Sequence, residues 1–354
     1  VYSSDITISE LGLNNGSRLA PVKSILLLVR GSGLFNDIPI GLVEKEVAFN
    51  QDLKCIQADS ETVLPEYIFY WLLGSKQLLR SILEVTGIGA GKFDTKLLQN
   101  LEIPLPSIEE QELIVKLCDS ISRKIEINER ISQLLENIAQ VIFKQWFVDF
   151  EFLDGNGNPY KSSGGKMVES ELRKIPEGWK TVCLSEIGDI VAGGTPSKTK
   201  NEYYENGNIA WITPKDLSGN KGIFISEGAT NVTELGLKKS SAKILPKYSV
   251  LFSSRAPIGY LAINKNEVCT NQGFKSIVPN EGIPYQFVYF YLKNSIGYIE
   301  SIAGGSTFKE ISGTAMKNLK VTLPPRNLLK EYKQIVEKIF NNIENYEDIS
   351  QILS

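Results

Sequence analysis

The residue types that usually carry out catalysis are absent or scattered in this chain. Its 354 residues include no histidine, which removes the commonest general base and a common metal ligand. The cysteines are far apart and form no CxxC pair, which argues against a zinc site or a disulfide framework. They are Cys55, Cys118, Cys183 and Cys269. Carboxylate and Ser-Lys chemistry stay open on residue types alone, but no spacing gathers the acidic residues into a metal-nuclease motif.

Two enzyme classes that handle nucleotides or DNA also lack their motifs. GIGAGKF (Gly87–Phe93) resembles a phosphate-binding loop, but Thr86 stands where the first glycine is needed and Phe93 replaces the Ser/Thr. We therefore interpret this segment as a turn before a strand. A methyltransferase would need a glycine-rich cofactor loop and an Asn/Asp-Pro-Pro-aromatic motif, whereas the one Pro-Pro pair, Pro324–Pro325, precedes Arg326.

The distribution of charge is more informative than its total. The net charge is −3, which alone does not suggest a nucleic-acid partner. Residues 1–106 carry 9 basic and 12 acidic side chains, whereas residues 179–324 carry 16 and 11. One block is therefore basic inside an acidic chain, and Lys and Arg side chains provide most of the affinity of proteins for DNA phosphates.

The chain contains a long internal repeat. Corresponding residues are offset by 218 to 225 positions, in the same order throughout. The clearest blocks are SELGL (Ser9–Leu13) with TELGL (Thr233–Leu237), PIG (Pro39–Gly41) with PIG (Pro257–Gly259), FNQDLKCI (Phe49–Ile56) with TNQGFKSI (Thr270–Ile277), and LEIPLP (Leu101–Pro106) with LKVTLP (Leu319–Pro324). This period is too long for a solenoid, so it indicates two copies of a whole domain, each with a trailing helix. The second copy opens near Trp179, so we expect the first copy to lack its beginning.

Two long helices are predicted to follow the two domains. Residues 107–149 contain no Gly or Pro, and Ser107 with Glu110 fits a capping box. A heptad pattern sets Asn128 in the a row, and an Asn in that row is a device that fixes coiled-coil register. The predicted a row is Ile114, Ile121, Asn128, Leu135 and Ile142, and the d row includes Leu117, Ile131 and Ile138. Residues 328–354 carry a similar apolar row that includes Asn342. The two helices either pair with each other, which the matching patterns favour, or pack on their own domains.

These elements define the predicted organisation. We expect an α+β chain with two similar, β-dominated mixed α/β domains and a pseudo-two-fold internal repeat. The boundaries are 1–106 for the first domain, 107–150 for the first helix, 151–178 for a Gly/Ser/Asn-rich linker, 179–324 for the second domain and 325–354 for the shorter second helix. No apolar run is long enough to span a bilayer and the start does not resemble a signal peptide, so a cytoplasmic protein without a membrane partner is expected.

Several motifs of the second half resemble a known family. They are GGTPS (Gly193–Ser197), NIAWITPKDLSG (Asn208–Gly219), LFSSRAPIGY (Leu251–Tyr260), CTNQGFKS (Cys269–Ser276) and GGSTFKEISG (Gly304–Gly313). As a set they resemble the target-recognition domain of type I restriction–modification specificity subunits. FKQWFVDFEF (Phe143–Phe152) and the residues after it resemble the segment that joins the two halves in that family.

The resemblance implies a DNA-binding subunit that is not itself an enzyme. Each globular copy would read one half of a split, asymmetric DNA target, and the two helices would pair antiparallel and set the spacing. Two methyltransferase subunits would dock on the helices, and restriction subunits with ATP-driven translocation would join them. S-adenosylmethionine, ATP and Mg²⁺ would belong to those partners, and this chain would hold no cofactor or metal. We expect weak DNA binding by the acidic chain alone.

Positions shared by both copies are candidates for scaffold or phosphate contacts, because the two copies should read different half-sites. The shared pairs are Arg30 with Arg255, Asn50 with Asn271, Gln51 with Gln272, and Lys54 with Lys275. A turn that holds two strands would equally explain the Asn-Gln pair. A structural ion pair would equally explain the arginines.

Basic positions that differ between the copies are further candidates for DNA contacts. They are Lys198, Lys200, Lys238, Lys239, Lys243 and Lys247, together with Thr307 and Lys309, which we expect opposite Lys92 of the first copy. A charge run is often only a solvated face, so these residues explain the basic block as a group. An alternative function is a non-enzymatic coiled-coil adaptor with two protein- or glycan-binding heads, and a regulatory specificity subunit without a motor also stays open.

Overall fold

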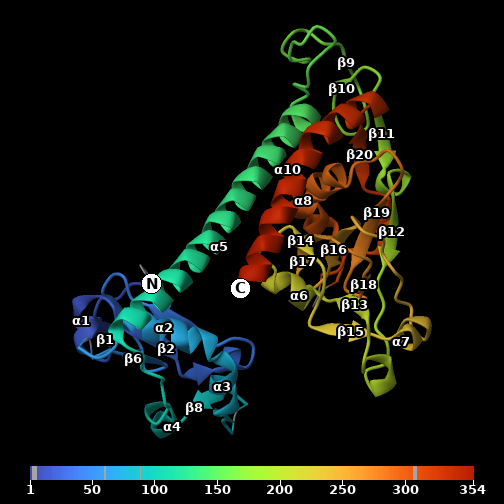
Figure 1. Cartoon of the computed structure of the whole chain (residues 1–354). Coiled ribbons are helices and arrows are strands. Elements are labelled where there is room, and N and C mark those ends of the chain that lie inside the picture. The colour runs from blue at the N-terminus through green and yellow to red at the C-terminus, as the bar shows by residue number, and fades with distance from the viewer. Residues whose placement is uncertain (2–5, 60, 88, 306–308) are drawn as a thin grey trace. The chain divides into compact units, whose positions relative to one another are not determined.

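The computed structural model describes residues 1, 6–59, 61–87, 89–305 and 309–354. The chain divides into two compact units, Val1–Lys124 (unit 1) and Ile125–Ser354 (unit 2). The boundary lies within one continuous helix, α5 (Ile108–Phe143), which Figure 1 shows running from one unit into the other. Both units mix short strands with helices, which confirms the predicted α+β class.

The described part of unit 1 has three small sheets and two buried apolar clusters. The sheets are β1 (Arg18–Ala20) with β5 (Val47–Phe49); β4 (Ile40–Leu42), β2 (Ile25–Leu28) and β6 (Leu53–Ile56); and β3 (Arg30–Gly31), β8 (Gly91–Phe93) and β7 (Leu83–Val85). The short helices are α1 (Glu10–Asn14), η1 (Ser32–Phe35), α2 (Pro65–Gly74), α3 (Lys76–Ser81) and α4 (Thr95–Gln99). Ile25 and Leu27 of β2 and Leu79 of α3 are at most 1% exposed, because β2 is the central strand and α2 and α3 cover it.

The start of α5 belongs to unit 1 and is fixed to it by polar contacts. The backbone N–H of Ser107 donates to Glu110 Oε2 at 3.0 Å and the N–H of Glu110 donates to Ser107 Oγ at 3.3 Å, which confirms the capping box. Gln111 is fully buried, and its Oε1 accepts the N–H of Leu64 at 2.9 Å. The Tyr70 hydroxyl on α2 donates to Asp119 at 2.6 Å. The helix is therefore an integral part of the first domain's packing.

Unit 2 has a larger sheet system. Its main sheet has the order β12 (Gly188–Ala192), β19 (Lys275–Pro279), β16 (Val250–Ser254), β17 (Ile258–Asn264) and β14 (Phe224–Ile225). Smaller sheets join β15 (Thr230–Val232), β13 (Ile209–Ile212) and β18 (Cys269–Thr270), then β11 (Lys180–Cys183) with β20 (Lys320–Leu323), and β10 (Ile175–Pro176) with β9 (Met167–Val168). The helices are η2 (Lys144–Val148), η3 (Leu184–Glu186), η4 (Asn201–Tyr203), α6 (Pro214–Gly219), α7 (Glu234–Lys238), α8 (Tyr285–Ile302), α9 (Gly313–Lys317) and α10 (Arg326–Leu353).

The internal repeat is visible in the local geometry of both units. Ser9 caps α1 by accepting the N–H of Gly12, and Thr233 caps α7 by accepting the N–H of Gly236. The hydroxyls of Ser24 and Ser249 donate to the carbonyl three residues earlier, at 2.6 and 2.7 Å. The residues before these serines, Lys23 and Tyr248, share a left-handed backbone with φ of 68° and 66°. The same turn therefore leads into the central strand of each unit, as the repeat predicts.

The two long helices pair antiparallel within unit 2. Asn128 Nδ2 of α5 donates to Ser350 Oγ of α10 at 3.3 Å, whereas the ring of Phe143, later in α5, contacts that of Tyr332, earlier in α10, at 6.4 Å. Figure 1 shows α10 alongside the second half of α5. Asn128 is fully buried in this contact, as its predicted place in the apolar row requires.

Other parts of the predicted helix pattern are wrong. Asn342 is exposed, and the row of α10 that packs inward is Leu329, Tyr332, Val336, Phe340 and Ile343. On α5, Ile138 of the predicted d row is 51% exposed, whereas Ser132, Glu136 and Ala139 are buried. The helix turns a different face to its neighbours because α8 of the globular part packs against it as well as α10, which a two-helix heptad pattern does not include.

An aromatic cluster joins the helices to the globular part of unit 2. Phe147 contacts the rings of Phe287 on α8, Tyr332 on α10 and Trp179 at centroid distances of 5.0, 4.8 and 6.0 Å. The Arg173 guanidinium donates to the carbonyls of Phe147 and Val148 at 2.9 Å, at the end of η2. These contacts explain the FKQWFVDFEF motif, because its aromatic residues lie where two helices and a domain meet.

The predicted linker is a folded connection over much of its length. Asp154 Oδ1 accepts the N–H groups of Asn156 and Asn158 at 2.8 and 2.9 Å, and Tyr160 stacks on Phe152 at 4.7 Å. Within the part of the chain that the structure describes, no helix is both long and apolar enough to cross a membrane.

Candidate nucleic-acid interface

The GGTPS turn of unit 2 is shaped by close backbone packing. A Cβ on Gly193 would lie 1.9 Å from the carbonyl oxygen of Asn271, and one on Gly194 would lie 2.3 Å from the backbone nitrogen of Ala242. Both positions therefore require glycine. The Trp211 indole donates to the Gly194 carbonyl at 3.0 Å, which holds the turn against β13.

This turn lies beside the Asn-Gln turn that follows β18. The Thr195 hydroxyl donates to Gln272 Oε1 across the two loops. The Asn271 side chain is used within its own loop, because its Oδ1 accepts the N–H of Gly273 at 2.8 Å. In unit 1, Asn50 Oδ1 accepts the N–H of Asp52 at 3.0 Å. The two asparagines thus shape equivalent turns, whereas Gln51 and Gln272 beside them are exposed.

Beside the Asn-Gln turn, three charged residues of unit 2 meet. Arg255 follows β16, whose last residue, Ser254, donates its N–H to the carbonyl of Gly273 at 2.7 Å. The Glu310 carboxylate accepts from Arg255 Nη1 and from Lys275 Nζ, each at 3.3 Å. The Arg255 and Glu310 side chains are 37% and 35% exposed, and Lys275 only 13%. We name Arg255, Lys275 and Glu310 the charged triad.

The equivalent place in unit 1 has a different charge. Phe93 donates its N–H to the carbonyl of Val29 at 3.0 Å, as Ile311 does to Ser254 at 3.1 Å, so Lys92 corresponds to Glu310. Lys92 is the direct strand partner of Arg30 on one side and of Glu84 on the other. Directly opposed residues of an antiparallel pair share a face of the sheet. Arg30, Lys92 and Glu84 therefore form an exposed row, and Lys54, which corresponds to Lys275, is also exposed.

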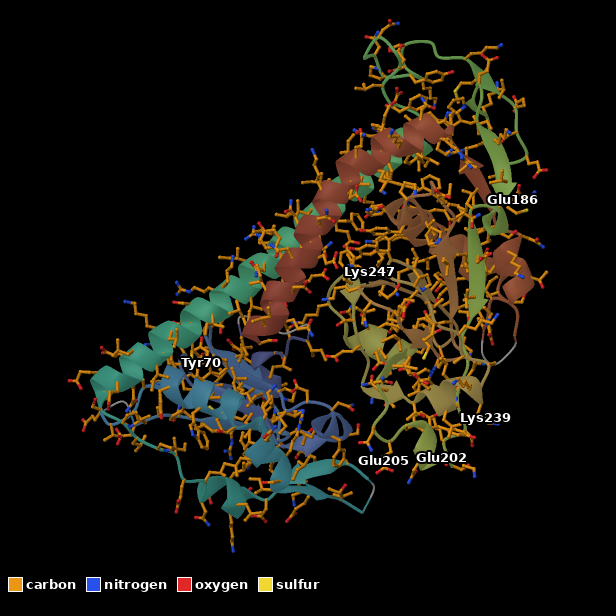
Figure 2. The ribbon with its side chains drawn as sticks, turned by 45° about the vertical axis from the view of Figure 1, so that its right-hand side comes forward. Tyr70, Glu186, Glu202, Glu205, Lys239 and Lys247 are labelled. Atoms are coloured by element: carbon orange, nitrogen blue, oxygen red, sulfur yellow. The ribbon has the colours of Figure 1, made fainter. Side chains whose placement is uncertain are left out.

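The predicted lysines of unit 2 do not form one cluster. A first group comprises Lys198, Lys200, Lys238 and Lys239. Lys198 and Lys200 are exposed on the segment that follows the GGTPS turn, and η4 at its end packs on α7 through Thr233 and Tyr203. Lys238 and Lys239 lie at the end of α7, where Lys238 is 3.9 Å from Glu234. This first group also meets acidic residues, since Figure 2 shows Glu202 and Glu205 at the same end as Lys239.

The remaining predicted residues differ in their surroundings. Lys247 lies apart from Lys239 in Figure 2 and pairs with Glu344 of α10 at 3.6 Å, with its ammonium 4.4 Å from the ring of Tyr248. The structure therefore places Lys247 against the helix pair. Lys243 and Lys309 are exposed. Thr307 lies outside the described residues.

Glu310, Glu84 and Thr195 were missed by the sequence reasoning. The sequence indicates Glu310 only when GKFD (Gly91–Asp94) is aligned with KEIS (Lys309–Ser312), so that the N-cap residues of the following helices, Asp94 and Ser312, coincide. That alignment sets Lys92 opposite Glu310. The prediction aligned Lys92 with Lys309 instead, one residue away.

A separate cavity of about 750 Å³ lies in unit 2 between α5, α10 and residues 219–229. The Glu347 carboxylate closes one side of it and accepts the N–H groups of Ile223 and Phe224 at 2.8 and 3.0 Å. Burial raises the pKa of Glu347 to about 7, although these two hydrogen bonds oppose the shift. Among the described residues, no group of three or more Cys, Asp or Glu side chains has the arrangement of a metal site.

Comparison with known proteins identifies the fold and the family. The model of the type I restriction modification DNA specificity domain matches residues 4–137 and 176–353. The chain belongs to the type I DNA specificity family. Each match covers one globular part and its trailing helix, so the specificity domain occurs twice.

Three relatives of this chain are themselves described as type I specificity subunits. The MjaIX specificity subunit of Methanocaldococcus jannaschii is 39% identical over 187 residues, which are 52% of this chain and 43% of that protein. The HindI specificity subunit of Haemophilus influenzae is 24% identical over 349 residues, 82% of this chain and 75% of that protein. The crystal structure of a type I S subunit from M. genitalium has the same fold, with a TM-score of 0.51 at 15% identity over 94% of this chain and 80% of that one.

Family membership gives the chain a role in DNA sequence specificity. The prediction of a non-catalytic specificity subunit is thereby confirmed, and the adaptor alternative loses its support. The stretch of this chain that aligns with the MjaIX subunit covers less than half of that protein's length.

Proposed function

We propose that unit 1 and the globular part of unit 2 each read one half of a split, asymmetric DNA target. The observation that carries this proposal is the double match of the DNA specificity domain, on residues 4–137 and 176–353. Two copies of one reading domain with different loop residues would bind two different half-sites. The globular parts correspond to residues 1–106 and 179–324.

The repeat separates residues with a scaffold role from residues that would contact DNA. Side chains that build the same turn in both units, such as Asn50 and Asn271, serve the scaffold. Exposed basic residues beside those turns, such as Lys54, would contact phosphates and supply salt-dependent affinity. Residues that differ between the units, such as Lys92 and Glu310, are the better candidates for making the two units recognise different half-sites.

The helix pair would set the spacing between the half-sites and dock two methyltransferase subunits. An exposed apolar stripe on α5 supports docking, with Ile127, Leu134, Ile138 and Val141 each at least 51% exposed. Together with the half-buried Ile131 they repeat at intervals of four and three residues, which is the spacing of a coiled-coil contact. A stripe of this kind is costly to leave in water and is typical of a protein–protein interface.

The remaining chemistry of the system would belong to other chains. S-adenosylmethionine would be held by the methyltransferase subunits, and ATP and Mg²⁺ by restriction subunits that translocate double-stranded DNA. The complex would act in the cytoplasm, where the DNA lies. With a net charge of −3, the chain would bind DNA weakly until those subunits close around the duplex.

The test is to co-express the chain with its candidate methyltransferase subunit and to map modified adenines across the host genome. The proposal predicts a stable complex and one methylated motif with two short specified halves and a fixed gap. If no complex forms and no new methylation appears, the docking role is wrong for that pair of subunits.

A further inference from the structure

The charged triad of unit 2 and the matching row of unit 1 occupy the same place in the repeated fold but differ in charge. Arg255 corresponds to Arg30, Lys275 to Lys54 and Glu310 to Lys92. Within the described part of the chain, Arg255 and Lys275 both form ion pairs with Glu310, whereas no ion pair of Arg30, Lys54 or Lys92 occurs. The corresponding position therefore carries Lys92 in unit 1 and Glu310 in unit 2. Arg30, Lys54, Lys92 and Glu84 give a net charge of +2, whereas Arg255, Lys275 and Glu310 give +1.

A carboxylate at this position changes what the neighbouring arginine can bind. Phosphate is anionic, so Glu310 at 3.3 Å from Arg255 and Lys275 would repel a phosphate brought to the same place. The edge of a guanine is neutral and offers two acceptors that match the planar donor pair of an arginine. A guanidinium held by a carboxylate and still exposed is well suited to that edge, because its orientation is fixed before binding.

The backbone around the triad supports a fixed geometry. Glu310 exchanges two backbone hydrogen bonds with Gly304, at 2.8 and 3.2 Å, and the N–H of the next residue, Ile311, donates to Ser254 at 3.1 Å. The backbone of Glu310 is thereby held beside the end of β16, where Arg255 is its direct antiparallel partner. Ala256, directly after Arg255, has a φ of 54°, which turns the chain sharply out of the strand.

We propose that Glu310 is a positioning residue that makes Arg255 a reader of a guanine in the second half-site, whereas Arg30 and Lys92 bind phosphate at the equivalent place of unit 1. This inference rests on the proposed function, because it needs each unit to face one half-site. It assigns the two units different kinds of contact at one shared structural position.

The test uses the chain in complex with its methyltransferase subunit and compares Glu310→Gln, Glu310→Lys and Arg255→Ala with the wild type. Binding to duplexes altered in the first or the second half is measured over a range of salt concentrations. Arg255→Ala should lower discrimination at one guanine of the second half by about ten- to hundred-fold. Glu310→Gln keeps the size of the side chain and should lower the same discrimination less, while leaving the first half unchanged.

Glu310→Lys should make unit 2 resemble unit 1. This variant should steepen the slope of log affinity against log salt concentration by about one. It should also raise the affinity for all sequences and abolish the discrimination between second-half sequences. Arg30→Ala is the matched control and should weaken binding to all sequences equally, with a salt dependence lower by about one ion. Circular dichroism confirms that each variant is folded.

The outcomes separate this inference from the proposed function. If Arg255→Ala and Glu310→Gln leave second-half discrimination intact while the wild type still recognises a split target, the proposed function holds and the inference is wrong. If the wild type recognises no split target, the proposed function itself fails.

Discussion

The two units have the same turns around a buried central strand but differ in charge at the end of that strand. In each, a left-handed residue, Lys23 or Tyr248, leads into a buried central strand, and a side-chain asparagine shapes the turn before the next strand. At the end of that central strand, unit 1 has Lys92 beside Arg30, whereas unit 2 has Glu310 beside Arg255. The comparison teaches that the repeat keeps the residues that hold the backbone and differs in the charges at the proposed DNA contact.

The largest expected effects come from the matched core residues Leu27 of unit 1 and Phe252 of unit 2, which are 1% and 0% exposed. Leu27→Ala should cost about 2–5 kcal/mol and Phe252→Ala about 3–5 kcal/mol, because each leaves a cavity. Since the two residues lie in separate cores, each variant should shift one unfolding transition in denaturant and spare the other. Equal shifts of a single transition for both variants would show that the units unfold as one.

Glu347 provides a pH dependence that should be confined to unit 2. Its carboxyl pKa of about 7 lies above the unfolded value, so the folded state binds the proton more tightly. The stability of unit 2 should therefore fall as pH rises from about 4.5 to 7, by up to about 3 kcal/mol. Glu347→Gln should flatten this slope in pH-dependent unfolding. A slope that persists in the variant would assign the effect to other groups.

The two turn asparagines should have similar, smaller effects. Asn50→Ala and Asn271→Ala each remove one side-chain hydrogen bond to a loop N–H, at 3.0 and 2.8 Å, and should each cost about 1 kcal/mol of unfolding free energy. Melting of both variants checks this. If only Asn271→Ala lowers DNA affinity without lowering stability, Asn271 contacts DNA and is more than a turn residue.

The smallest effects distinguish two lysines of unit 2. Lys239→Ala should lower the slope of log DNA affinity against log salt concentration by about one, because this residue is exposed at the end of α7. Lys247→Ala should leave it unchanged, because Lys247 pairs with Glu344 on α10. Salt titrations of both variants are compared. The opposite ranking would move the DNA-binding face toward the helices.

Much of the architecture could be predicted from local sequence signals. The long helix after Pro106 and its Ser107–Glu110 capping box depend on neighbours close in sequence, and the repeat is found by comparing the two halves of the sequence. The structure contains each of them. Family motifs such as GGTPS were informative because their glycines are needed for close packing, as at Gly193 against Asn271.

What could not be predicted depends on partners distant in sequence. The helix α8 packs on both long helices, against Glu136 of α5 and Phe340 of α10. A heptad count of two helices therefore misplaced Ile138 of α5 and Asn342 of α10. Glu310 meets Arg255 and Lys275 only in the folded sheet. Charge pairing of Lys247 with Glu344 likewise joins segments that no local pattern connects.

The central claim is that the two units read separate half-sites, and an exchange of residues 179–324 tests it most directly. The exchange uses the corresponding segment of a relative with a different target, and methylation is then mapped across the genome. The account predicts that one half of the methylated motif changes while the other half and the gap stay the same. A change in both halves, or in neither, would contradict it.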